Sequence, residues 1–235
     1  MIAIVDQRIP VSMKNGLLNA GFSVIPLPAF SRLAPPVASH PDMLMFPFED
    51  RLFVHKGYYE EACNTIDTII SASGLTLTLL DTEVAPEYPN DVSLNLFCIG
   101  KNLIGKKDII PEAILDHAQE KGYCIIDTNQ GYAKCSSVLL GDRAVITADP
   151  SIQSCIEALG IDVLRISKGA VSLPPYPYGF LGGASGCFGN TVYFCGDLEK
   201  HPDSKRIIAF CQKHSFSVHS LSSEPLADLG SIFFL

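Results

Sequence analysis

The chain has 235 residues, of which 47% are hydrophobic and 18% are charged, and its formal net charge is −8. This length is ample for a sizeable core, and so much apolar content with so little charge excludes an intrinsically disordered chain. The 17 basic residues are scattered along the sequence, so we expect neither a nucleic-acid partner nor an anionic membrane partner.

No window of the sequence is typical of a transmembrane helix, and the N-terminus begins with a strand-like run in place of a signal peptide. The closest of the eight cysteines, Cys187 and Cys195, are eight residues apart, so no CxxC motif supports a zinc or thioredoxin-type site. Free buried thiols fit a chain without an export signal. We therefore expect a cytoplasmic protein with no metal and no cofactor.

The N-terminal residues predict a strand over 2–5, a helix near 11–19 and a second strand over 22–27. Gly21 separates the helix from the second strand. This order is only the later part of a longer pattern that the rest of the chain repeats.

Four further segments share one pattern: a strand, a polar turn, a returning strand, a helix and another strand. In the clearest copy, strands at 136–140 and 143–147 flank a Gly-Asp turn, and Asp149 caps a helix that begins at Pro150 and stops at Gly160. The other copies predict strands at 43–46, 52–55 and 75–80 with a helix near 58–71; strands at 93–99 and 123–126 with a helix over 111–121; and strands at 187–188, 191–195 and 216–218 with a helix near 203–213.

The last five residues, 231–235, read as an apolar strand that would complete the N-terminal unit. Because no single unit can bury its helix face and sheet alone, the five units are expected to close into a ring. We predict an α/β fold, a five-bladed β/α propeller of ββαβ-type repeats with pseudo-fivefold symmetry, closed by the C-terminal strand. The units are expected near 1–39 plus 226–235, 40–81, 90–127, 132–167 and 179–221. An open α/β sheet is the alternative, but it does not explain the hairpin before each helix.

This architecture resembles the pentein superfamily of guanidino-group-modifying enzymes, which includes amidinotransferases, arginine deiminase and dimethylarginine dimethylaminohydrolase. Two stretches, Gly-Phe-Leu-Gly-Gly-Ala-Ser-Gly at 179–186 and Gly-Asp-Leu-Glu-Lys-His-Pro-Asp at 196–203, look like a small bacterial family of that fold. The superfamily also includes a non-enzymatic relative, an anti-association ribosome factor. The resemblance therefore implies the fold and leaves enzymatic and non-enzymatic functions open.

In this superfamily the site is a central funnel, lined by the first strand of each hairpin and by the segment that leads into it. Its enzymes attack a guanidinium carbon with a cysteine, move protons with a histidine, and hold the cation with carboxylates. The resemblance makes Cys187 the candidate nucleophile. The fourth unit has no histidine, so the nearest substitutes for the acid/base are His40 or Lys134, of which His40 is the candidate catalytic residue. The candidate substrate-binding residues at matching positions are Asp42, Asp91, Asn95, Gln130, Lys134, Ser185 and Asp228.

Two functions remain open from the sequence. The first is a Cys-dependent hydrolase or transferase acting on a guanidino or amidino compound; the second is a non-catalytic binding or scaffold protein with a degenerate site. The enzyme hypothesis requires Cys187 within hydrogen-bonding distance of an imidazole or an ammonium group. Three acids, Asp42, Asp91 and Asp228, outnumber the one nearby base, Lys134, and predict that a ligand at the axis is a cationic or hydrogen-bond-donating small molecule. Failure to bind any guanidino or amidino compound would favour the scaffold hypothesis. The oligomeric state stays open.

Overall fold

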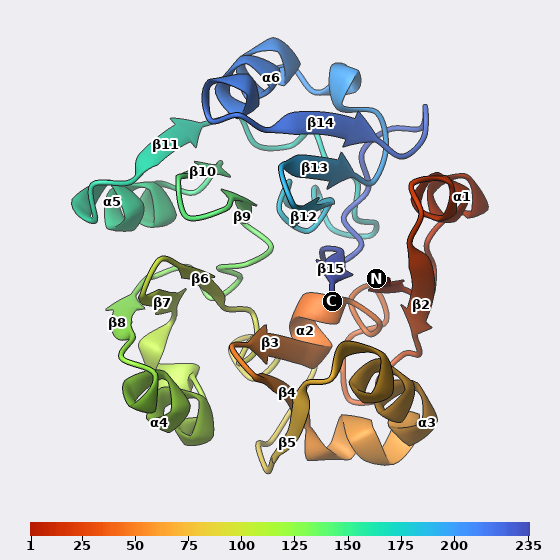
Figure 1. Cartoon of the computed structure of the whole chain (residues 1–235), viewed down its shortest axis with the longest axis vertical. Coiled ribbons are helices and arrows are strands. Elements are labelled where there is room, and N and C mark those ends of the chain that lie inside the picture. The colour runs from red at the N-terminus through yellow and green to blue at the C-terminus, as the bar shows by residue number, and fades with distance from the viewer.

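The computed structural model describes all 235 residues and arranges them as five three-stranded sheets around a common axis (Figure 1). In each sheet an antiparallel hairpin is followed by a helix, and the third strand then joins the returning strand in parallel. The helix that connects the second and third strands of each unit lies on the outside of the ring (Figure 1). The predicted five-bladed β/α propeller of ββαβ-type units is confirmed.

The turns within each hairpin are short, whereas longer segments connect one unit to the next. The first unit contains β1 (Ile2–Asp6), α1 (Val11–Asn19), β2 (Ser23–Leu27) and, from the other end of the chain, β15 (Phe233–Phe234). The second contains α2 (Pro41–Leu44), β3 (Met45–Phe48), β4 (Arg51–His55), α3 (Lys56–Ser73) and β5 (Thr76–Leu80). The third contains β6 (Phe97–Ile99), β7 (Asn102–Gly105), a 3-10 turn (Lys107–Ile109), α4 (Glu112–Glu120) and β8 (Cys124–Asp127). The fourth contains β9 (Ser137–Leu140), β10 (Ala144–Thr147), α5 (Pro150–Ala158) and β11 (Asp162–Arg165). The fifth contains β12 (Ser185–Phe188), β13 (Thr191–Phe194), a 3-10 turn (Leu198–Lys200), α6 (Ser204–Lys213) and β14 (Ser217–Ser220).

The two ends of the chain close the ring. β15 pairs antiparallel with β1, with Phe234 opposite Ala3, and backbone hydrogen bonds of 2.8 and 3.0 Å join Ile2 to Leu235. Both termini lie near the centre of the molecule (Figure 1). The predicted pairing of the last strand with the first is therefore confirmed.

Local sequence signals explain the start of α5. The side chain of Asp149 accepts hydrogen bonds from the backbone nitrogens of Ser151 and Ile152 at 2.8 and 3.0 Å, as an N-cap does. Ile152 and Ile156 are buried on the inner face of the same helix. Capping and apolar spacing together begin α5 at the predicted residue.

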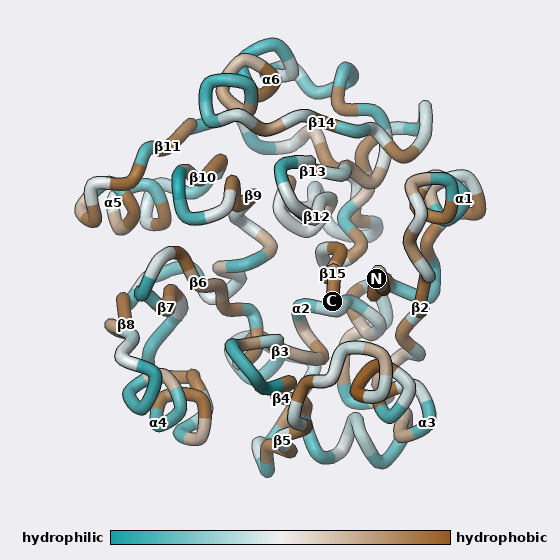
Figure 2. Tube along the Cα trace, viewed as in Figure 1, coloured by the Kyte–Doolittle hydropathy of each residue, from teal (hydrophilic) through white to brown (hydrophobic).

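The core runs across unit boundaries. One cluster of 25 buried residues joins the first, fourth and fifth units, and a second cluster of 19 joins the first and second. Along the trace, strands are mainly apolar while the outer helices alternate in hydropathy (Figure 2). Each unit therefore depends on its neighbours for its core.

Two predicted strands are too long. Residues 93–96 form a turn, and Met43 and Leu44 belong to the short helix α2. In the first case the side chain of Asn95 accepts a hydrogen bond from the backbone nitrogen of Cys135 at 3.0 Å, a contact that ties this segment to the leading segment of the fourth unit. The tertiary contact overrides the alternating pattern. No helix of the chain combines the length and apolar character that crossing a bilayer requires.

Candidate functional site

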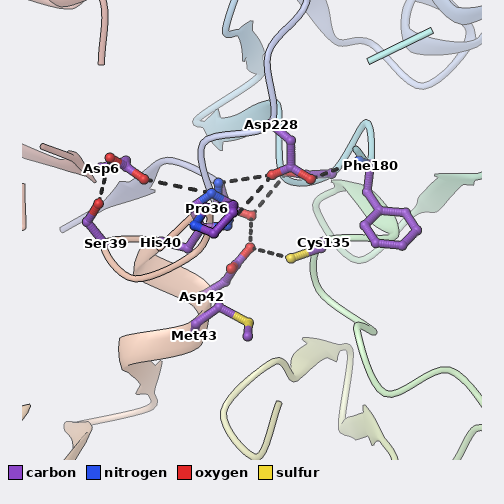
Figure 3. Close-up of polar contacts among 12 residues, drawn as sticks. Asp6, Pro36, Ser39, His40, Asp42, Met43, Cys135, Phe180 and Asp228 are labelled. Carbon is purple, nitrogen blue, oxygen red and sulfur yellow. Dashed lines mark hydrogen bonds and ion pairs between the residues drawn. The ribbon is translucent and has the colours of Figure 1, made fainter. Parts of the chain in front are cut away.

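Buried polar side chains fill the axis of the ring (Figure 3). They come mainly from the leading segments, the residues just before the first strand of each hairpin. Six of them are at most 2% exposed: Asp6, His40, Asp42, Asn95, Asp228 and Ser231. Ring closure thus brings together residues that are far apart in sequence.

One half of this network centres on Asp42. Its Oδ2 accepts hydrogen bonds from Ser231 Oγ at 2.6 Å and from Cys135 Sγ at 3.1 Å. Lys134 Nζ in turn donates to Ser231 Oγ at 3.0 Å. Burial and the Asp42 carboxylate raise the pKa of the Cys135 thiol well above its usual value, and burial lowers the pKa of Lys134. The Cys135 thiol is therefore a protonated hydrogen-bond donor and not a thiolate.

The other half centres on His40, which lies between two carboxylates (Figure 3). Its Nε2 is 3.7 Å from Asp6 Oδ2 and its Nδ1 is 3.9 Å from Asp228 Oδ1. Burial alone would raise the pKa of Asp6, but hydrogen bonds from Arg8 hold it below its usual value. Burial raises the pKa of Asp228, whose oxygens accept hydrogen bonds from backbone nitrogens only, those of Phe180 at 2.8 Å and Gly230 at 3.1 Å. Asp228 consequently has no basic side chain as a hydrogen-bond partner.

A cavity of about 330 Å³, here called the aromatic cavity, is lined by His40, Asp228 and four aromatic side chains. These four are Tyr132, Tyr176, Tyr178 and Phe180. The rings of Tyr132 and Phe180 stack with centroids 5.9 Å apart, and Tyr178 meets Phe180 edge-on at 6.4 Å. The cavity combines a π-rich wall with a buried carboxyl group.

Asp91 lies behind the cavity wall and contacts the wall residue Tyr132. Its Oδ2 accepts a hydrogen bond of 2.8 Å from the hydroxyl of Tyr132, and burial and this contact raise the pKa of Tyr132. Asp91 therefore positions an aromatic wall residue, while its own carboxylate does not line the cavity.

Glycines allow the close packing behind the cavity. A Cβ at Gly183 would collide with the carboxylate of Asp228, and a Cβ at Gly230 would collide with the side chain of His40. The glycine-rich stretch 179–186 thus seats Asp228 in the interior, where its backbone hydrogen bonds fix the orientation of the carboxylate.

Cys187 lies in a different cavity of about 180 Å³, here called the thiol cavity, together with Lys134 and Ser185. Its Sγ makes one hydrogen bond, to the carbonyl oxygen of Gly189 at 3.8 Å. Burial raises the pKa of Cys187, although the charge of Lys134 acts in the opposite direction. The enzyme hypothesis requires an imidazole or ammonium group within hydrogen-bonding distance of this thiol, and no such group lies there.

The predicted site residues therefore separate into two groups. His40, Asp42, Asn95, Lys134 and Asp228 meet in the axial network, and Asp91 touches its aromatic wall. Three lie apart: Cys187; Ser185, which donates to the carbonyl of Gly182 at 3.2 Å; and Gln130, which donates to Asp149 Oδ2 at 2.8 Å. No group of three or more His, Cys, Asp or Glu side chains is placed to hold a metal ion.

Sequence reasoning missed Asp6, Tyr132, Cys135 and Ser231. Tyr132 and Cys135 belong to the leading segment that contains Lys134, so their place in the chain was a usable signal. Ser231 lies two residues before the last strand, β15, and Ser185 is the first residue of β12, so both serines lie where the first strand of a hairpin begins. Asp6 ends β1, which is not a leading segment, and the pattern contains no comparable signal for it.

Comparison with known proteins identifies the fold. A family model described as "Family of unknown function (DUF6873)" matches residues 4–233. No curated protein matches the chain. Among solved structures, the chain is similar to the amidinotransferase SxtG of the saxitoxin pathway from Microseira wollei, with a TM-score of 0.58 and 12% identity over 91% of this chain and 76% of the other. It is also similar to dimethylarginine dimethylaminohydrolase from Pseudomonas aeruginosa in complex with citrulline, with a TM-score of 0.55 and 8% identity over 94% and 91% of the two chains.

A third similar structure is inosamine-phosphate amidinotransferase from Streptomyces griseus, with a TM-score of 0.53 and 11% identity over 93% of this chain and 77% of the other. By their names, two of these three proteins are amidinotransferases and the other is a dimethylarginine dimethylaminohydrolase. At these identities the likeness establishes the shared pentein fold, while the chemistry of this chain has to be argued from its own residues.

Proposed function

The chain belongs to the family of unknown function DUF6873, and we propose that it binds a small organic cation of the guanidino or amidino class in the aromatic cavity. The observation that supports this function is the pairing of the Asp228 carboxylate with the rings of Tyr132, Tyr178 and Phe180 in one cavity. In this proposal the protein binds its ligand without cysteine-dependent chemistry.

Of the three axial carboxylates, only that of Asp228 accepts no hydrogen bond from a side chain. Asp6 is paired with Arg8 by an ion pair of 2.5 Å, and Asp42 already accepts hydrogen bonds from Ser231 and Cys135. Asp228 has only backbone donors, and His40 stays 3.9 Å away. A cationic ligand would supply the missing countercharge, and its attraction to the carboxylate is strong in an interior of low dielectric constant.

The aromatic wall suits the same ligand. A planar guanidinium stacks on Tyr and Phe faces, and such cation–π contacts contribute roughly 0.5–2 kcal/mol. A cavity of about 330 Å³ lies at the lower end of the range for small-molecule sites. Size, aromatic lining and a buried carboxyl group therefore favour one compact cation.

The alternative function is Cys-dependent hydrolysis or transfer on a guanidino compound. It is favoured by one observation: Cys187 and Lys134 line the same thiol cavity. Two observations oppose it, the raised pKa of Cys187 and the hydrogen bond that directs Lys134 toward Ser231. A nucleophilic thiol needs a depressed pKa or an adjacent base.

The proposal includes a cytoplasmic location. All eight cysteines are free, which fits a reducing compartment.

Calorimetric titration with benzylguanidine tests the binding function, with neutral benzyl alcohol as the matched ligand. We expect the wild-type protein to bind benzylguanidine and not benzyl alcohol. Asp228→Asn should weaken binding by about tenfold or more because it removes a charge-assisted contact. Asp108→Asn, which changes an exposed carboxylate outside the cavity, is the control and should bind like wild type.

Equal binding of benzylguanidine by the wild type and Asp228→Asn would contradict the assigned role of Asp228. Absence of binding by a folded wild-type protein would remove the cation function and leave the scaffold reading.

A further inference from the structure

A second, larger cavity of about 480 Å³ lies between the fourth and fifth units and is here called the interunit cavity. It shares two wall residues, Tyr178 and Phe180, with the aromatic cavity. None of the axial residues His40, Asp42 or Asp228 lines it. It is therefore a separate space with its own chemistry.

Two basic side chains of this cavity have no carboxylate partner. Arg165, at the end of β11, donates to the amide oxygen of Gln153 at 3.1 Å and forms no ion pair. Lys168 is exposed, forms no ion pair, and its ammonium lies 5.9 Å from the centroid of the Tyr178 ring. Unpaired cations at one cavity are notable in a chain whose net charge is −8.

Neutral donors line the same space. The Nδ1 of His201 accepts the backbone N–H of Asp203 at 3.0 Å, so the neutral ring has its proton on Nε2, where it is a donor. His201 is 3% exposed. The hydroxyl of Ser136 is buried in the cavity wall without a hydrogen-bond partner. An unpartnered buried hydroxyl in a cavity wall is the feature that a bound ligand satisfies.

One acid also lines the cavity, but its oxygens already accept hydrogen bonds. Asp149 accepts hydrogen bonds from the backbone nitrogens of Ser151 and Ile152 and from the side chain of Gln130. It therefore acts as the cap of α5, and its carboxylate is held by donors of its own. The groups that remain unpaired in the interunit cavity are donors and cations.

We propose that the interunit cavity binds a small organic oxyanion, a carboxylate or phosphate attached to an apolar group. Arg165 and Lys168 would contact the oxyanion, with Ser136 and His201 as neutral donors, and the apolar part would lie against Val171, Phe180 and Leu181. The site is additional to the cation site, because its charge has the opposite sign and its polar residues are different.

Calorimetric titration with phenyl phosphate and with benzoate at constant ionic strength tests this site and shows which oxyanion it prefers. We expect at least one of the two to bind the wild-type protein more tightly than inorganic phosphate does. Arg165→Gln and Lys168→Gln should each weaken that binding by about tenfold, the effect of losing one charge-assisted hydrogen bond. Lys205→Gln, which changes an exposed lysine of α6 outside the cavity, is the matched control and should bind like wild type.

Benzylguanidine binding by each variant separates this site from the cation site, and the circular dichroism spectrum reports its fold. The oxyanion site is overturned if neither aromatic anion binds the folded wild-type protein, whatever benzylguanidine does. It is also overturned if Arg165→Gln and Lys168→Gln bind the anions as wild type does, or if Lys205→Gln is weakened equally, because the ions would then be attracted by surface charge in general.

Discussion

The aromatic cavity and the thiol cavity border the same buried network, yet they offer different chemistry. Cys135 lines the first and the adjacent residue Lys134 lines the second. In the aromatic cavity the Asp228 carboxylate accepts hydrogen bonds from backbone nitrogens only, with His40 3.9 Å away, whereas in the thiol cavity Cys187 lacks an acid/base partner. This propeller therefore presents the Asp228 carboxylate at one cavity and a thiol without an activating partner at the other.

The reason lies in how Lys134 is used. A cation beside a thiol lowers the pKa of the thiol when the two are in contact. Here the ammonium donates to Ser231 Oγ at 3.0 Å, and Ser231 donates to Asp42. Lys134 therefore stabilises the buried network, and burial has the largest effect on the pKa of Cys187.

The largest expected effect comes from removing the strand that borders the thiol cavity and closes the ring. Deleting residues 231–235 removes Ser231 from the network and exposes the edge of β1. Truncating one buried core side chain costs roughly 2–5 kcal/mol, against about 5–15 kcal/mol for a whole domain. We expect insoluble or unfolded protein, measured by solubility and circular dichroism.

Phe233→Ala provides a soluble version of this test. It should lower the free energy of unfolding in urea by about 3 kcal/mol or more. Leu18→Ala, at a side chain that is 47% exposed, should change that free energy far less. A truncated chain that melts like the full one would refute ring closure as a source of stability.

A smaller loss should follow from breaking the network between the two cavities. Asp42→Asn removes the negative charge nearest to the half-buried Lys134 and weakens the hydrogen bonds from Ser231 and Cys135, which costs about 2 kcal/mol. Urea unfolding measures the loss. In Asp42→Asn/Lys134→Met part of it should return, since no unpaired charge remains.

If Asp42→Asn is as stable as wild type, the network does not depend on that carboxylate charge, and Lys134 would be free to act on Cys187.

His55, at the end of β4, lies outside both cavities and makes the stability of the protein depend on pH. Burial lowers the pKa of His55 to about 4. Between pH 4 and its unfolded value near 6.5 the folded state binds fewer protons than the unfolded state, so the free energy of unfolding falls as the pH falls through this range. His55→Gln should remove this pH dependence, which amounts to a change of up to about 3 kcal/mol in the free energy of unfolding. Urea unfolding between pH 4 and 7 measures it.

His219→Gln, at an exposed histidine of β14, is the control and should leave the slope unchanged. A His55→Gln profile identical to that of wild type would mean that folding does not lower the pKa of His55.

The smallest expected effect is a difference in alkylation rate between Cys187 and the exposed thiols, and it tests whether Cys187 is activated. Site-resolved alkylation by iodoacetamide at neutral pH should modify the exposed thiols Cys63 and Cys124 first. Cys187 is half-buried with a raised pKa, so it should react roughly tenfold more slowly. Alkylation of Cys187 ahead of both exposed thiols would favour the Cys-dependent function over the binding function.

Much of the fold was predictable because its signals are local. The Asp149-Pro150 helix start, the glycine turns and the repeat spacing depend on residues within one unit. Ring closure was predictable because a partial unit at one end of the chain complements a strand at the other. The prediction failed at residues 93–96, where Asn95 contacts Cys135 across the axis.

The candidate site was predictable by segment but not by residue. The leading segments were correctly expected to supply polar side chains, and His40, Asp42 and Asp228 do meet at the axis. Which of two neighbours, Lys134 or Cys135, faces which cavity is set by how the fourth unit packs against the others. The sequence by itself therefore determined the five units and the polar character of their centre. The contacts between units decide which axial carboxylate accepts no side-chain hydrogen bond and which thiol has no activating partner, because both depend on distances between residues that are far apart in the chain.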